Sequence, residues 1–236
     1  MRLDKFFSEM GLLSRKETAK AAKAGRITVN GEVLRRADGH IREEEDVICL
    51  DGAVISYRPY EYIWLNKPAG YVSATEDGHL PCVTELLPPA LSGRGLFPCG
   101  RLDRDTVGLM LLTNDGALSH ALLSPRRHVQ KEYRFSCDPP LPNDAEERFA
   151  AGMTIDGGEV CKPARLCCHA GREAGVITLT EGKYHQIKRM VEACGSRVTA
   201  LERISFAGIP LDPALGRGET RPATEEEIER LRHATD

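Results

Sequence analysis

The sequence lacks long hydrophobic runs, and none approaches the ~20 apolar residues that a membrane-spanning helix requires. The N-terminus has no secretory pattern, because Met1-Arg2-Leu3-Asp4 leads directly into an amphipathic segment. A phosphate-cradling glycine loop, a dinucleotide-binding fingerprint and a His-Glu-x-x-His motif are also absent. We therefore expect a cytoplasmic protein that makes no membrane contact and needs no cofactor.

Close cysteine pairs are absent too, although the chain has eight cysteines. None of them forms a Cys-x-x-Cys pair, the spacing from which zinc sites are normally built. A chain of 236 residues also has no need of disulfides to stabilise its fold. We expect no metal site, and reduced, buried thiols that act as small hydrophobic side chains.

Charge is unevenly distributed along the chain. The net charge is −3, but residues 1–42 contain ten lysines and arginines against five acidic residues, which leaves −8 for the remainder. The hydrophobic content of 41% and the charged content of 28% are ordinary for a folded, soluble protein. A basic first segment on an acidic chain predicts local binding of a polyanion.

The basic segment has clear helix and hairpin signals. Leu3, Phe6, Phe7 and Met10 form the apolar stripe of a short helix that ends at Gly11. A capping box at residues 14–17 begins a second, alanine-rich helix that ends at Gly25. The Asn30-Gly31 pair predicts a hairpin between residues 27–29 and 33–34, and we expect the module to end near residues 46–48.

Lys16, Lys20 and Lys23 lie on one face of the second predicted helix. They form an ordinary solvated surface or a phosphate-binding patch, and the neighbouring arginines favour the patch. The residues that we predict to contact RNA in this segment are Arg2, Arg15, Lys16, Lys20, Lys23 and Arg26. Residues 2–6, 11, 14–15 and 25–31 together resemble the small RNA-binding module named after ribosomal protein S-four, over about residues 1–50.

A polar, turn-rich stretch at residues 50–60 predicts a domain boundary. Beyond it, the pattern predicts strands near residues 62–65, 107–113, 131–136 and 176–180. Helices are predicted after Gly116, around the stripe at residues 187–194, and after a second capping box at residues 224–227.

Asp103 lies just before the apolar strand at residues 107–113, with Arg101 and Arg104 close by in sequence. A free aspartic acid has a pKa of about 3.9, so it is a carboxylate at neutral pH. Such a carboxylate beside a cation can carry out covalent or electrostatic catalysis at a sugar carbon. The alternative is that Asp103 only pairs with an arginine or caps a turn.

Four separated segments of the second region resemble those of RNA pseudouridine synthases, in the same order. They are Leu65-Asn66-Lys67-Pro68-Ala69-Gly70, Gly100-Arg101-Leu102-Asp103-x-x-Thr106-x-Gly108-Leu109, Lys131-x-Tyr133 and Glu181-Gly182-Lys183-Tyr184-His185-Gln186-Ile187-Lys188-Arg189-Met190. The resemblance covers nearly the whole chain and fits the branch that acts on the small ribosomal subunit. It implies an α+β protein with an RNA-binding domain and linker at residues 1–58, and a catalytic domain at residues 59–236 with a mixed, mostly antiparallel sheet flanked by helices.

The resemblance also assigns roles to single residues. Asp103 matches the catalytic aspartate, which attacks the anomeric carbon of the ribose or promotes a glycal route. Arg101 matches the arginine that fills the space left by the flipped-out uridine; otherwise it makes a surface salt bridge. The other implied substrate contacts are Tyr133, Ile187 and Lys188, and Lys188 matches the basic residue that pairs with the catalytic carboxylate. The further implied RNA contacts are Lys67, Lys183 and Arg189. From the residues alone, Tyr133 is a core tyrosine and Lys188 flanks the helix stripe. Val107 departs from the Thr or Ser frequent in this branch.

The function implied is the isomerisation of one uridine to pseudouridine in 16S ribosomal RNA, free or in a partly assembled small subunit, by a monomer without a cofactor. Three alternatives stay open: a synthase that acts on 23S rRNA, a non-catalytic rRNA-binding assembly factor, and a glycosidase. A glycosidase needs two paired acid groups, and Asp105 is the only carboxylate near Asp103 in sequence.

Overall fold

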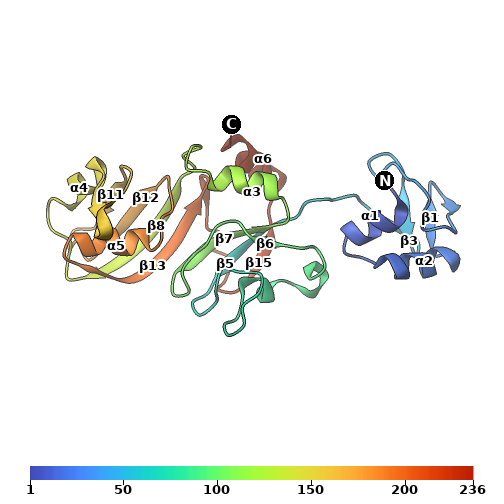
Figure 1. Ribbon diagram of the computed structural model, residues 1–236, viewed down its shortest axis with the longest axis horizontal. Helices are drawn as coiled ribbons and strands as arrows, with labels where there is room; N and C mark the ends of the chain where they lie inside the picture. The colour runs from blue at the N-terminus through green and yellow to red at the C-terminus, as the bar shows by residue number, and fades with distance from the viewer. Residues whose placement is uncertain (236) are drawn as a thin grey trace. The chain divides into compact units, whose positions relative to one another are not determined.

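The computed structural model describes residues 1–235, and the chain forms two compact units. We call Met1–Glu61 with Leu87–Leu96 the head unit, and Tyr62–Leu86 with Phe97–Asp236 the body unit. The head unit begins at the blue end of the chain in Figure 1, and the body unit reaches the red end. The body unit therefore holds all four segments that resemble the synthases, and the head unit holds the segment that resembles the RNA-binding module.

The head unit packs two helices on a four-stranded antiparallel sheet of order β2-β1-β3-β4. Its elements are α1 (Leu3–Glu9), α2 (Arg15–Lys23), β1 (Ile27–Val29), β2 (Glu32–Val33), β3 (Ile48–Leu50), β4 (Ala53–Ile55) and the 3₁₀ turn η2 (Pro89–Leu91). The predicted stripe of α1 is buried, since Leu3, Phe6 and Phe7 are fully inaccessible to solvent. The ring of Phe6 also stacks on Tyr57, with 5.8 Å between centroids.

The helix ends and the first hairpin of the head unit agree with the sequence. Glu17 N donates to Ser14 Oγ at 3.3 Å, and Ser14 N donates to Glu17 Oε2 at 2.7 Å, which confirms the capping box. Asn30 and Gly31 have φ of 52° and 85°, the left-handed conformations that a tight hairpin turn requires. The sheet continues beyond residues 46–48, where the sequence places the end of the module, because an Asp51-Gly52 turn adds β4 to it.

The body unit is organised around a nine-stranded sheet whose main path runs β11-β12-β8-β13-β7-β5-β15. Its strands are β5 (Tyr62–Lys67), β6 (Phe97–Pro98), β7 (Val107–Thr113), β8 (Lys131–Asp138), β11 (Arg165–Cys168), β12 (Ala174–Leu179), β13 (Arg197–Phe206), β14 (Ile209–Pro210) and β15 (Thr220–Pro222). Among the named strands of residues 1–235, β7–β13 is the one parallel pair. The sheet is therefore mixed and mostly antiparallel, as predicted.

Helices and small turns complete the body unit. They are η1 (Val83–Leu86), α3 (Gly116–Leu123), α4 (Ala145–Ala151), η3 (Asp156–Gly158), α5 (Gln186–Ala193) and α6 (Glu225–His233), with the small hairpin β9 (Thr154–Ile155) and β10 (Glu159–Val160). α3 and α6 lie side by side next to β7, whereas α4 and α5 lie near the β8–β11–β12–β13 end (Figure 1). The second predicted capping box is present, since Glu227 N donates to Thr224 Oγ1 and Thr224 N to Glu227 Oε2.

The core under α3 and α6 centres on Trp64, which is fully buried. Its indole Nε1 donates to Glu227 Oε2 at 3.1 Å, so the one polar atom of the ring is satisfied. Most of the cysteines are buried or partly buried, as expected, but Cys167 on β11 is exposed. Strand alternation explains this difference, because the neighbouring Leu166 is the residue that faces the core.

Candidate active site

Asp103 lies in the loop that leads into β7, and its side chain is 28% exposed. The loop is held on both sides. Leu102 N donates to Ser73 Oγ at 2.9 Å and Ser73 Oγ donates to Leu102 O at 2.7 Å, while Thr106 N donates to Asp103 O at 3.1 Å. A partly accessible carboxylate is therefore presented on fixed backbone at the start of a core strand.

The cation beside this carboxylate is Lys188, from the first half of α5. Its Nζ lies 2.9 Å from Asp103 Oδ2 and 2.7 Å from Asp105 Oδ1. Lys188 thus pairs with Asp103, as the resemblance implies. Arg101 and Arg104 do not take this place: both are exposed, and no ion pair found in residues 1–235 joins either of them to Asp103.

The two carboxylates keep the Lys188 ammonium charged. Burial lowers the pKa of Lys188, but the hydrogen bonds to Asp105 and Asp103 outweigh this effect, so the net shift is upward. For Asp105, burial is the largest single effect and raises the pKa, but the hydrogen bond from Lys188 and the Lys188 charge, with smaller contributions, together outweigh it, so the net shift is downward. Lys188 therefore stays a cation beside Asp103 over the whole physiological pH range.

His185 is a second group at this carboxylate, and it comes from the segment at residues 181–190 that resembles the synthases. Its Nε2 lies 3.5 Å from Asp103 Oδ1, and its ring stacks on Tyr184 with 3.8 Å between centroids. His185 precedes α5 with a left-handed φ of 48° and makes no side-chain cap. Non-glycine residues adopt this conformation rarely, and such strain is often found at functional sites.

Tyr133 and Ile187 are both almost inaccessible to solvent, with 8% and 5% exposed. Tyr133 on β8 lies opposite Arg203 on β13, and Arg203 lies opposite Gly108 on β7. The sheet therefore separates the strand of Tyr133 from the strand that follows Asp103 by one strand. No hydrogen bond joins Tyr133 to Asp103 in the part of the chain that the structure describes. Ile187 lies in the first turn of α5, one residue before Lys188.

Gly108 and Arg203 explain how β7 and β13 approach each other. A Cβ atom on Gly108 would lie 2.3 Å from Arg203 O, and Gly108 has a φ of 103°. The Arg203 side chain is 1% exposed, and its Nε donates to Leu109 O at 2.6 Å. Only glycine fits at position 108. Sequence reasoning missed the buried role of Arg203, because nothing in its local pattern marks it.

The prediction that Lys67 contacts RNA is wrong. β5 continues beyond the predicted end at Leu65, and Lys67 at its end is 0% exposed. Its ammonium donates to the carbonyl oxygens of Pro68, Asp103, Arg104 and Thr106 at 2.8–3.3 Å. Burial lowers its pKa from 10.5 to about 8. Lys67, at the end of β5, therefore holds the Asp103 loop in place through hydrogen bonds to its backbone.

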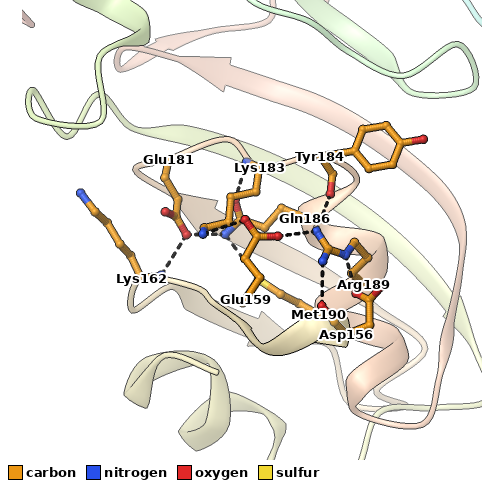
Figure 2. A network of polar contacts seen from close by, with 9 residues as sticks. All are labelled: Asp156, Glu159, Lys162, Glu181, Lys183, Tyr184, Gln186, Arg189 and Met190. Carbon is orange, nitrogen blue, oxygen red and sulfur yellow. Dashed lines mark hydrogen bonds and ion pairs between the residues drawn. The ribbon is translucent and has the colours of Figure 1, made fainter. Parts of the chain in front are cut away.

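Lys183 and Arg189, which are predicted to contact RNA, belong to a polar network that joins α5 to the β9–β10 hairpin (Figure 2). Lys183 Nζ lies 2.9 Å from Glu159 Oε1, and Arg189 Nη1 lies 2.7 Å from Glu159 Oε2. Arg189 Nε also pairs with Asp156. The buried Glu181 accepts from Gln186 Nε2 at 2.7 Å and from Lys162 N at 2.9 Å. These side chains position α5, and through it Lys188.

The predicted RNA contacts of the head unit divide into two groups. Arg2 forms an ion pair with Asp4, and Arg26 forms one with Asp51, so both are engaged within the unit. The other four residues are exposed on α2: Arg15, Lys16, Lys20 and Lys23. Thr18, Ala21 and Ala22 form the buried face of this helix. The lysines therefore point away from the core of the unit and are open to a polyanion.

A search of residues 1–235 for metal-binding groups finds no cluster of three or more His, Cys, Asp or Glu side chains. In the same residues no helix is both long enough and apolar enough to span a bilayer. At this site the Asp103 carboxylate lies beside the Lys188 ammonium. Such a carboxylate can attack a sugar carbon or stabilise positive charge there.

Comparison with protein-family models gives two matches. Residues 61–193 match the model described as RNA pseudouridylate synthase, and residues 1–48 match the S4 domain. The first match contains Asp103, Tyr133 and Lys188. The second contains the four exposed cations of α2.

Similar proteins cover nearly the whole chain. Uncharacterized RNA pseudouridine synthase YtzG of Bacillus subtilis (strain 168) is 40% identical over 98% of this chain and 98% of its own length. Ribosomal small subunit pseudouridine synthase A of Escherichia coli (strain K12) is 39% identical over 97% of this chain and 98% of its own. A solved structure described as "Crystal structure of pseudouridylate synthase" has a TM-score of 0.68 and 36% identity, and covers 98% of this chain and 99% of its own.

Proposed function

Because this chain belongs to the RNA pseudouridylate synthase family, we propose that it converts one uridine of 16S rRNA to pseudouridine, with Asp103 as the catalytic residue. As a member of that family it is an isomerase that acts on RNA. The observation that carries the proposal is the ion pair between Asp103 and Lys188 at 2.9 Å, on a carboxylate that is still partly accessible. A structural salt bridge would not need the open side of this carboxylate.

The reaction is an isomerisation, so its atoms balance without a second substrate. The bond between the ribose anomeric carbon and N1 of uracil breaks, and a bond from that carbon to C5 forms. The proton on C5 is lost, and N1 gains one. Asp103 acts either as the nucleophile at the anomeric carbon or as the base that starts a glycal route, and Lys188 places a positive charge 2.9 Å from it.

The uridine must leave its stack to reach this carboxylate. We assign the exposed Arg101 to the space that the uridine leaves, and Tyr133 and Ile187 to the base itself. The buried state of Tyr133 and Ile187 fits contact with an apolar base face inside the fold. Ile187 directly precedes Lys188 on α5, and Tyr133 lies on β8, with only β13 between it and β7; both places support this assignment.

The substrate is assigned from the relatives and from the charge of the head unit. Several relatives are named for the small ribosomal subunit, among them the protein of Haemophilus influenzae at 37% identity. The exposed cations of α2 suit phosphate contacts. We therefore propose residues 1–58 as the RNA-binding domain and linker, residues 59–236 as the catalytic domain, and a cytoplasmic monomer that acts on rRNA or a partly assembled small subunit.

Paired substitutions test the catalytic role. Asp103→Asn should lower pseudouridine formation in a 16S transcript by at least about 10³-fold, because the reacting carboxylate is lost. RNA affinity should stay within about twofold, because the head unit is unchanged. Asp105→Asn is the matched control: it removes the same charge from the same lysine, but from a side chain that is 72% exposed. Equal losses in the two variants would refute the assignment of Asp103.

A chemical map of rRNA pseudouridines in cells without this protein separates the remaining alternatives. One missing site in 16S rRNA supports the proposal, and one in 23S rRNA moves the substrate to the large subunit. An unchanged map favours a non-catalytic assembly factor. Release of free uracil from RNA by the purified protein would indicate a glycosidase.

A further inference from the structure

The aromatic ring of Tyr184 is open to solvent directly beside the proposed active site. Tyr184 is 70% exposed, which is unusual for a large aromatic side chain. One face of its ring stacks on His185, with 3.8 Å between centroids and 18° between the planes. His185 Nε2 in turn lies 3.5 Å from Asp103 Oδ1. The rings of Tyr184 and His185 therefore lie between the free face of Tyr184 and the Asp103 carboxylate.

The backbone beneath this ring is fixed, although the ring itself is free. Arg189 Nη1 donates to Tyr184 O at 3.1 Å, and Lys183 N donates to Gln186 Oε1 at 3.0 Å. Figure 2 shows the Tyr184 ring pointing away from this network, while its carbonyl points into it. Within residues 1–235 no hydrogen bond to the Tyr184 hydroxyl is found. Several side chains thus fix the backbone that carries this ring, although the ring itself stabilises little of the fold.

We propose that Tyr184 is a stacking platform for the RNA base next to the flipped-out uridine. The inference rests on the proposed function, because the occupant is defined by the uridine at Asp103. A uridine turned out toward Asp103 leaves its neighbours without a stacking partner on that side. Aromatic side chains beside an extruded or single-stranded nucleotide commonly supply that partner, and tyrosine does so with little loss of conformational freedom. The ring lies where a base adjacent to the uridine needs it.

The strained His185 fits the same arrangement. Its left-handed backbone conformation costs energy, and no side-chain capping hydrogen bond of His185 offsets this cost. This conformation places the imidazole between Tyr184 and Asp103, so a base on the free face of Tyr184 continues one stack that ends at the carboxylate. Stacking needs the ring and not the hydroxyl. Phenylalanine should therefore replace tyrosine here, whereas alanine should not.

Tyr184→Ala and Tyr184→Phe, with Tyr60→Ala as a matched control, test the platform. Tyr60 is another exposed tyrosine, at 49%, outside the proposed site. Loss of base–aromatic stacking predicts that Tyr184→Ala raises KM for a 16S transcript by roughly 5- to 150-fold. The kcat should change by less than about fivefold, and Tyr184→Phe and Tyr60→Ala should behave as the wild type. Circular dichroism checks that the alanine variant is folded.

Two steady-state results with the 16S transcript would overturn the platform. One is an unchanged KM in Tyr184→Ala. The other is a loss confined to kcat, which would mean that Tyr184 only holds His185 against Asp103. In a synthetic RNA spanning the modified site, removal of the base on one side of the uridine should abolish the difference between Tyr184→Ala and the wild type. An undiminished difference with either neighbouring base removed also contradicts the proposal.

A binding measurement distinguishes failure of this inference from failure of the proposed function. The dissociation constant for the 16S transcript is compared between Asp103→Asn and the Asp103→Asn, Tyr184→Ala double variant, since neither forms product. A larger dissociation constant of the double variant supports the platform, even if the wild type forms no pseudouridine. A wild type that forms no pseudouridine would by itself refute the proposed function. Equal dissociation constants refute the platform whatever the activity.

Discussion

Lys67→Met tests whether a buried lysine holds the catalytic loop. Methionine keeps the unbranched side chain as far as Cε but removes the ammonium. In the native protein this group donates to the carbonyl oxygens of Asp103 and Arg104 at 3.1 and 3.3 Å, and to that of Thr106 at 2.8 Å. The substitution therefore detaches the segment that carries Asp103 from β5 without touching its carboxylate.

The effect on stability should be small, because two terms oppose each other. The carbonyls of Asp103 and Arg104 keep backbone donors, so the loss falls on those of Pro68 and Thr106. An unsatisfied buried carbonyl costs about 1–3 kcal/mol, which gives about 2–6 kcal/mol for the pair. Lowering the lysine pKa from 10.5 to about 8 means that folding already disfavours the charged form, by about 3 kcal/mol. The net loss of unfolding free energy is then at most about 3 kcal/mol.

The effect on catalysis should be larger, because a misplacement of about 1 Å can lower the rate roughly 100-fold. We expect kcat to fall by about that factor, measured as pseudouridine formed in a 16S transcript, with stability followed by urea unfolding. Lys131→Met is the control, because Lys131 is also buried with a pKa lowered to about 8, and its Nζ donates to Val129 O, away from the Asp103 loop. An unchanged kcat in Lys67→Met, or an equal loss in Lys131→Met, would refute the reasoning.

Two further substitutions test the packing of the body unit. Gly108→Ala should lower the unfolding free energy in urea by about 3 kcal/mol, because its Cβ would lie 2.3 Å from Arg203 O; Gly116→Ala, where nothing lies within 4 Å, should have almost no effect. Glu227→Gln should cost about 2–3 kcal/mol at pH 7, because the hydrogen bond from Arg221 lowers the Glu227 pKa to about 2. A carboxylate with a lowered pKa stabilises the fold fully above its unfolded pKa of about 4.3, and this stabilisation is lost as the pH falls toward 2. The difference in unfolding free energy between the wild type and Glu227→Gln should therefore shrink from pH 5 to pH 3, and an equal difference at both pH values would contradict the prediction.

Local sequence signals predicted most of the elements. The capping boxes at Ser14 and Thr224, the Asn30-Gly31 turn and the stripe that begins at Ile187 all depend on residues within about eight positions of one another. Such short-range chemistry is legible in the sequence because each element satisfies it on its own. The same holds for Asp103, whose place before the strand at residues 107–113 follows from the pattern around it.

What only the tertiary structure decided is which side chain meets which across the sheet. Asp103 lies beside Lys188, 85 positions away, and not beside Arg101 or Arg104, which are its neighbours in sequence. Lys67 carries a charge that predicts a surface, yet it is fully buried, because four carbonyls converge on it once β5 and the loop before β7 are in place. The sequence by itself determined most of the elements and the place of the proposed catalytic carboxylate before β7. The partners of that carboxylate depend on strand pairing between distant segments, and no local pattern records it.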